Sequence, residues 1–202
     1  MSRMNNSMNN STNNSKMNTE LFDQQTRSQE WARQAAIVVG ASLFVAVCAR
    51  VSVPLPFTPV PLTLQNFGVL AVGLTLGSRR GFAALLLYLA EGAAGLPVFS
   101  MGGGIAHLFG PTGGFLLTYP LVAFVAGWLY EKTSRHFAAA ALASFVAELV
   151  LFAGGLAWLA VFTHSISLAF KYGLYWFVFA EVIKIMIAAA VGSRWHKPNP
   201  SL

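Results

Sequence analysis

Charged side chains are scarce in this chain of 202 residues. Only 10% of the residues are Asp, Glu, Lys or Arg, whereas 55% are hydrophobic. Soluble domains carry about 25% charged residues, so the composition argues against a soluble globular enzyme. The scarcity is greater after Arg33, because 7 of the 20 charged residues lie within the first 33 positions. The chain beyond Arg33 is therefore predicted to be an integral membrane protein.

Cysteine and histidine are also rare. A single Cys48 excludes an internal disulfide, and the four His residues are scattered without the spacing of a zinc site. The net charge is +6, but the basic residues fall in pairs between apolar runs rather than on one polar face, so nucleic acid is not an expected partner. The sequence thus predicts no cofactor and no metal site.

Three regions of the chain differ in composition. Residues 1–30 are polar, with seven Asn before position 19, and this predicts a disordered cytoplasmic tail. Residues 31–195 form the predicted membrane domain, and residues 196–202 a short cytoplasmic C-terminus. The apolar segments of the membrane domain are Trp31–Ala49, Leu62–Leu76, Gly81–Phe99, Gly114–Tyr130, Phe137–Phe162 and Gly173–Ser193. Several approach the roughly 20 residues of a spanning helix, so the fold class is predicted to be all-α, a bundle of six transmembrane helices.

The positions of Lys and Arg predict the orientation of these spans. Ten of the thirteen basic residues fall on one side of the membrane if the chain crosses it six times. Cytoplasmic loops are enriched in Lys and Arg, so both termini are expected in the cytoplasm. Under this topology two unusual loops lie outside: a Pro-rich loop at residues 53–61 and a Gly-rich loop at residues 96–114.

The two outer loops have different expected structures. The prolines at positions 54, 56, 59 and 61 fix φ and prevent a helix before Pro61, which predicts a stiff apolar flap. The Gly-rich loop is either a re-entrant turn or backbone that closes over a ligand, and the sequence favours neither. It is not a phosphate-binding loop, since no Gly-Lys-Ser/Thr follows it. Within the fifth span, Gly154 and Gly155 predict a kink.

Ionisable residues inside the predicted spans are the first candidates for function, because each costs about 2.5 to 3.5 kcal/mol there. Glu181 and Lys184 are three residues apart and therefore project from one helix face. They form either a self-neutralising ion pair or, in the preferred interpretation, a donor and an acceptor for a polar ligand. Glu148 has no neighbouring base and is expected to be a protonated or interhelically hydrogen-bonded acid rather than a ligand contact.

Further polar candidates lie near the two loops. Glu91 precedes Gly92, so its helix face permits close approach of a substrate or of another backbone. Gln65 and Asn66 follow the Pro-rich loop, and their amides either cap loop carbonyls or contact a ligand from the outer side.

Small residues recur on the first span. Ala32, Ala36 and Gly40 are spaced every fourth residue, a pattern that permits close helix contact. The pattern fits internal packing and a docking face for a partner protein equally well.

Together these residues resemble the biotin transporter BioY family, the substrate-binding (S) components of energy-coupling factor (ECF) transporters. The resemblance covers about residues 35–193. It rests on PLTLQ at 61–65, YLAEGAAGLPVF at 88–99, GPTGG at 110–114 and the acid-x-x-Lys pair of Glu181 and Lys184. Two features depart from the family pattern. The acid of the last helix is often Asp in the family, and many members carry a basic residue in the Gly-rich loop, where residues 101–107 here include neither Lys nor Arg.

The resemblance implies a protein that binds biotin from outside the bacterial cytoplasmic membrane and delivers it inward. The resemblance implies delivery when the protein is coupled to a transmembrane scaffold subunit and two ATPase subunits, and whether it also works alone is left open. Because the chain has no Walker motif, any ATP use must come from such partners. The implied binding residues are Glu181 for the ureido N–H groups of biotin and Lys184 for its carbonyl, with Lys184 to the carboxylate left open. Glu91, Gln65 and Asn66 complete the candidate site. The first-helix face of Ala32, Ala36 and Gly40 is the implied docking face for the scaffold.

Three other functions are alternatives to biotin capture. An S component for a different vitamin would have a similar bundle and first-helix face. An intramembrane enzyme using Glu148 or His164 lacks any Ser/His, Cys/His or HExxH arrangement, so the chain is not expected to be an enzyme. A passive channel is disfavoured because the charged pair is isolated rather than part of a polar file.

The tail is predicted to be dispensable for binding. Residues 1–18 contain no apolar residue except Met and cannot join a packed core. Deletion of these residues should leave the biotin affinity of the purified protein unchanged in a calorimetric titration. A large loss of affinity in the truncated protein would show that the tail contributes to the site.

Overall fold

The computed structural model describes residues 2–195 and is mainly helical. The predicted C-terminal segment, residues 196–202, lies outside the described residues. The elements are α1 (Ser2–Arg50), β1 (Ser52–Val53), β2 (Leu62–Thr63), α2 (Gln65–Leu76), α3 (Ser78–Ala93), the 3-10 helix η1 (Ile105–Leu108), α4 (Gly113–Glu131), α5 (Phe137–Thr163), α6 (Ile166–Gly173) and α7 (Val178–Trp195).

Each of the six predicted spans overlaps one of the helices α1 to α5 and α7, and α6 is an additional short helix. Within the described residues, three helical stretches are long and apolar enough to cross a membrane: Thr26–Arg50, Gly113–Glu131 and Phe137–Thr163. A fourth span results if α6 and α7, bent by 51° at their junction, count as one broken crossing, and α2 is a shorter apolar helix. A helical membrane protein is thus supported, while six spans with both termini inside stay a prediction.

The short helix α6 begins at a local signal within an apolar region. The Ser165 hydroxyl accepts a hydrogen bond from the Leu168 backbone N–H at 3.3 Å, which caps the first turn. Hydrophobicity alone does not separate α6 from α7. The predicted sixth span began at Gly173, whereas the structure ends α6 at Gly173 and begins α7 at Val178.

The first part of α1 differs from the predicted disordered tail. By its internal contacts the described part of the chain divides into one unit that ends at Ile37 and a second that begins at Val38. The structure has helical backbone from Ser2 onward, including the polar residues up to 30. Asn and Ser are weak helix formers, and most helices depend on packing of an apolar face, so the composition contained no signal for this helix.

Glycines allow α4 and α5 to pack closely in the unit formed by residues 38–195. A Cβ atom at Gly155 would collide with the Phe115 ring, and one at Gly114 with the Trp158 side chain. The kink expected at Gly154 and Gly155 stays a prediction, and α5 runs without a break over Phe137–Thr163. The two glycines admit side chains of α4 against the backbone of α5.

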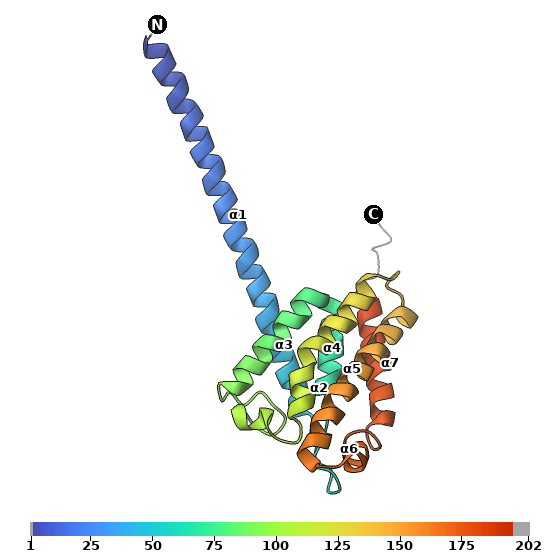
Figure 1. Ribbon diagram of the computed structural model, residues 1–202. Coiled ribbons are helices and arrows are strands. Elements are labelled where there is room, and N and C mark those ends of the chain that lie inside the picture. The colour runs from blue at the N-terminus through green and yellow to red at the C-terminus, as the bar shows by residue number, and fades with distance from the viewer. Residues whose placement is uncertain (1, 196–202) are drawn as a thin grey trace. The chain divides into compact units, whose positions relative to one another are not determined.

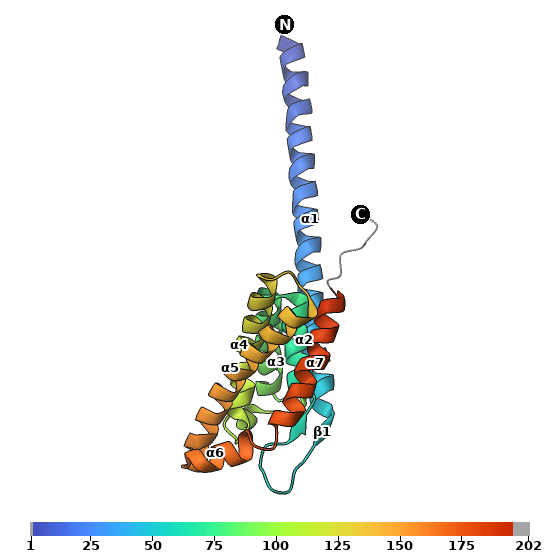
Figure 2. The same ribbon diagram turned by 90° about the vertical axis from the view of Figure 1, so that its right-hand side faces the viewer.

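The Pro-rich loop, the Gly-rich loop and α6 gather at one end of this unit, while the turn between α4 and α5 lies at the other (Figures 1 and 2). The Pro-rich loop is closed by the antiparallel pair β1–β2, with Ser52 opposite Thr63 and Val53 opposite Leu62. Its Thr58 hydroxyl donates a hydrogen bond to the Tyr172 carbonyl at 2.7 Å, which ties the loop to α6. The predicted stiff flap is therefore a hairpin anchored to a neighbouring helix.

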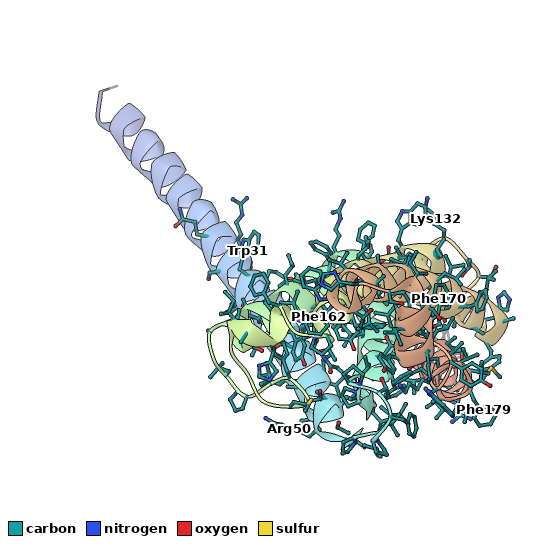
Figure 3. The ribbon with its side chains drawn as sticks, turned by 60° about the horizontal axis from the view of Figure 1, so that its bottom comes forward. Trp31, Arg50, Lys132, Phe162, Phe170 and Phe179 are labelled. Atoms are coloured by element: carbon teal, nitrogen blue, oxygen red, sulfur yellow. The ribbon has the colours of Figure 1, made fainter. Side chains whose placement is uncertain are left out.

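Large apolar side chains cover the outside of the helices. Phe179 of α7 is 80% exposed and points away from its neighbours, and Phe162 and Phe170 are about half exposed (Figure 3). Such exposure would be unfavourable in water, but it suits helices whose surroundings are lipid chains.

The predicted topology can be tested by labelling cysteines at opposite ends of the unit. Ser100 lies in the Gly-rich loop and Ser134 in the turn between α4 and α5, so Ser100→Cys and Ser134→Cys should react with an impermeant thiol reagent from opposite faces of the membrane. The parent protein serves as background because its single Cys48 is buried. Labelling of both variants from the same face would contradict the six-span topology.

Candidate ligand-binding site

A cavity of about 70 Å³ opens at the end of the bundle that carries both loops. Four residues of the predicted site, Glu181, Lys184, Gln65 and Asn66, lie in its wall. The remaining wall is largely apolar and aromatic, with Phe99, Phe115, Leu116, Tyr119, Leu151, Phe152 and Phe177. A mostly apolar cavity with a few converging polar groups is typical of a small-molecule site.

The charged pair of α7 forms an ion pair within this wall. Lys184 Nζ lies 2.7 Å from Glu181 Oε1, and the two residues are only 6% and 7% exposed. Their spacing of one helical turn makes the contact, as the sequence predicted. A buried pair of this kind needs further hydrogen bonds to offset the loss of hydration.

Asn66 supplies those further hydrogen bonds and connects three helices. Its Nδ2 donates to Glu181 Oε2 of α7 at 2.7 Å and also to Glu148 Oε1 of α5. The predicted interhelical hydrogen bond of Glu148 is thereby confirmed. Two acceptors of this network, Asn66 Oδ1 and Glu148 Oε2, are buried and lack a hydrogen-bond partner among the described residues. Because Asn66 lines the cavity, its free carbonyl oxygen is an acceptor for a ligand donor.

Tyr88 links the cavity to the Gly-rich loop and was not singled out from the sequence. Gln65 Nε2 donates to the Tyr88 hydroxyl at 2.8 Å, and that hydroxyl donates to the Val98 carbonyl at 2.9 Å. Tyr88 is fully buried, and its ring packs edge-on against Phe99 with 5.4 Å between centroids. A buried Tyr hydroxyl usually has a hydrogen-bond partner, so a polar role for Tyr88 could have been expected from the sequence. The sequence did not show that its partners would be Gln65 and Val98.

The Gly-rich loop is held in place by its own backbone and by α5. The Gly104 N–H donates to the Gly92 carbonyl at 2.7 Å, which anchors the loop to the last turn of α3. At the other end of the loop, Trp158 Nε1 donates to the Gly110 carbonyl at 2.9 Å. Phe99, Ser100 and other loop residues line the cavity, so the loop forms part of its wall.

Other predicted residues lie outside the cavity lining. Glu91 Oε2 accepts a hydrogen bond from the Ser42 hydroxyl at 2.6 Å, which joins α3 to the bundle portion of α1. Ala32, Ala36 and Gly40 do not line the cavity either, and a Cβ atom at Gly40 would meet no atom within 4 Å. The structure thus brings together Gln65, Asn66, Glu181 and Lys184, but not Glu91.

The fold and this cavity define a class, that of helical membrane proteins with a small, mostly apolar cavity that carries a few polar groups. A sequence model of the BioY family matches residues 12–201, and the chain belongs to this family. It is 37% identical over 164 residues to a probable biotin transporter BioY of Pyrococcus horikoshii, covering 81% of this chain and 96% of that protein. It is 41% identical over 165 residues to the biotin transporter BioY of Thermotoga maritima, covering 79% of this chain and 95% of that protein.

A solved structure shares the fold. The crystal structure of the S-component for biotin from an ECF-type ABC transporter superposes with a TM-score of 0.77 at 23% identity. The match covers 85% of this chain and 94% of that chain. The mainly helical S-component fold that the resemblance implied is confirmed, while the number of spans and their orientation stay predictions.

Tyr88 is predicted to stabilise the connection between the cavity and the Gly-rich loop. Tyr88→Phe would leave the Gln65 amide and the Val98 carbonyl without this partner, at a cost of about 1 to 3 kcal/mol. The variant should therefore melt at a lower temperature than the parent in detergent. Tyr175→Phe is the matched control, since Tyr175 is 74% exposed. Equal melting temperatures for the two variants would contradict this role.

Proposed function

We propose that this protein captures biotin at the outer face of a bacterial cytoplasmic membrane, as the substrate-binding component of an ECF transporter. The observation that carries the proposal is the cluster of Glu181, Lys184 and Asn66 in the cavity wall. Relatives that align over most of their length are named biotin transporters.

The chemistry of the cluster suits the ureido ring of biotin, which has two N–H donors and one carbonyl acceptor. Glu181 accepts one N–H, and the buried Asn66 Oδ1, without a partner among the described residues, accepts the other. An ammonium group has three donors, and Lys184 uses one of them on Glu181, so it can also donate to the ureido carbonyl. A ligand that lacked these groups would leave buried polar atoms unpaired, which is how hydrogen-bonding sites discriminate strongly.

The apolar part of the cavity receives the rest of the ligand. Phe99, Phe115 and Phe177 line it from the Gly-rich loop, α4 and the segment directly before α7. Aromatic walls bury the fused rings and the aliphatic chain without adding polar groups that need partners. Glu91 ranks behind the cluster as a ligand contact, because its hydrogen bond to Ser42 would have to open first.

The transport step is assigned to partners. With six spans and both termini inside, the Pro-rich and Gly-rich loops face outward and the cavity is filled from outside. Ala32, Ala36 and Gly40 form the face that docks the transmembrane scaffold subunit, which in turn couples to two ATPase subunits. Open space at Gly40 is compatible with close approach of a partner helix.

Glu181→Gln tests the site. Both Glu181 oxygens accept hydrogen bonds, so the new amide must direct its NH₂ group at Lys184 or at Asn66 and also loses an acceptor for the ureido ring. We expect biotin affinity to fall at least tenfold, about 1.4 kcal/mol, in a calorimetric titration of purified protein. Some thermal stability should be lost as well, because Lys184 then lacks its counter-charge.

Glu131→Gln is the control that separates affinity from stability. Glu131 accepts hydrogen bonds from the Ser78 backbone N–H and hydroxyl at 2.8 and 2.9 Å, far from the cavity. This variant should lose stability while keeping the parent's affinity. Parent-like biotin binding by Glu181→Gln would refute the assignment. If biotin fails to bind the parent but another vitamin binds, the protein is an S component for that vitamin.

A further inference from the structure

The carboxylate of the ligand needs a partner that the polar cluster does not supply. This inference rests on the proposed function, because it takes biotin as the ligand. Two residues of the cavity lining can carry a positive charge, Lys184 and His107. Lys184 is already paired with Glu181 at 2.7 Å. A ligand carboxylate placed there would compete with Glu181 for the same ammonium group and would lie beside the Glu181 carboxylate at short range, which is unfavourable in a poorly hydrated site.

His107 lies on a different element, in the Gly-rich loop. It belongs to η1, and its backbone N–H donates to the Gly104 carbonyl at 3.1 Å. Gly104 in turn donates to Gly92 at the end of α3, so the backbone that carries His107 is anchored to the bundle. The imidazole lies beside the buried Phe99 ring, with 6.1 Å between ring centroids. These contacts hold His107 in the cavity wall.

The His107 side chain has an unused hydrogen-bonding atom. Its Nδ1 is buried and has no hydrogen-bond partner among the described residues. Buried polar atoms are nearly always paired in folded proteins, so an unpaired one in a cavity wall indicates a ligand contact. Imidazole donates from one ring nitrogen when neutral and from both when protonated, and a carboxylate is a strong acceptor for either form.

We propose that His107 binds the carboxylate of the ligand through a ring N–H, while Glu181, Lys184 and Asn66 hold the ureido ring. The loop residues 101–106 contain no Lys or Arg that could take this role. His107 then determines the preference of this protein for the free acid over uncharged derivatives.

The test compares biotin with biotinamide, in which an uncharged carboxamide replaces the carboxylate. Both ligands are titrated into the purified full-length parent and into His107→Phe, which keeps a flat ring but has no donor. We expect biotin affinity to fall at least tenfold in the variant and biotinamide affinity to change less than threefold. The preference for biotin over biotinamide should therefore largely disappear. His136→Phe is the matched control, because His136 is exposed and lies outside the cavity lining.

Two further variants at position 107 separate the loss of the N–H donor from a change in side-chain shape. His107→Arg supplies N–H donors at the same position and should recover the preference for biotin, whereas His107→Leu should lose it as His107→Phe does. Melting without ligand reports whether each variant is folded, and the ratio of the two affinities within one variant is insensitive to the folded fraction. Equal loss for both ligands, or an unchanged ratio, would overturn the assignment.

The same data separate this inference from the proposed function. If the parent binds neither ligand, biotin capture itself is wrong. If the parent binds biotin but does not distinguish it from biotinamide, biotin capture stands and the role of His107 is refuted. If the preference is lost in Lys184→Gln and retained in His107→Phe, the carboxylate binds at Lys184 and the inference is again overturned.

Discussion

The amide of Asn66 holds together the buried charges on which the binding site depends. Two carboxylates, on Glu148 and Glu181, share its Nδ2 group, and Lys184 balances one of them. Charges removed from water must be paired and fully hydrogen-bonded, or they destabilise the helices that carry them. Because the participating residues come from α2, α5 and α7, the network also fixes how these helices are rotated about their axes. The acceptors that it leaves unused are the positions at which a ligand donor gains most.

Close backbone contacts hold this network in register. A Cβ atom at Gly73 of α2 would lie 2.6 Å from the Ala123 carbonyl oxygen of α4, and one at Gly127 of α4 would lie 2.5 Å from the Ser78 nitrogen. Larger residues at these positions would separate α4 from its neighbours. Since Phe115 and Tyr119 of α4 line the cavity, its width depends on glycines that never touch it. Small residues at helix contacts therefore contribute to the site through packing.

The two loops complete the site from one end of the bundle. The Pro-rich loop cannot form a helix, and its β1–β2 pairing and Thr58 hydrogen bond hold it next to α6. The Gly-rich loop is held by Gly92 and Trp158, and Tyr88 connects it to α2 through Gln65. The Gly-rich loop is thus connected through Tyr88 to Gln65, the neighbour of Asn66 in α2, whereas the Pro-rich loop is connected to α6.

The sequence by itself determined the class of protein, the positions of its long apolar helices, the adjacency of Glu181 and Lys184, and the family. These properties depend on composition or on spacing within a single helix, which local periodicity reports directly. It did not determine the helical start of α1, the separation of α6 from α7, or the role of Gly154 and Gly155. Tertiary structure alone decided that Asn66 meets Glu148, that Glu91 pairs with Ser42, and that His107 reaches the cavity. Each of these depends on how separate elements pack around one another, and no local pattern in the chain encodes that arrangement.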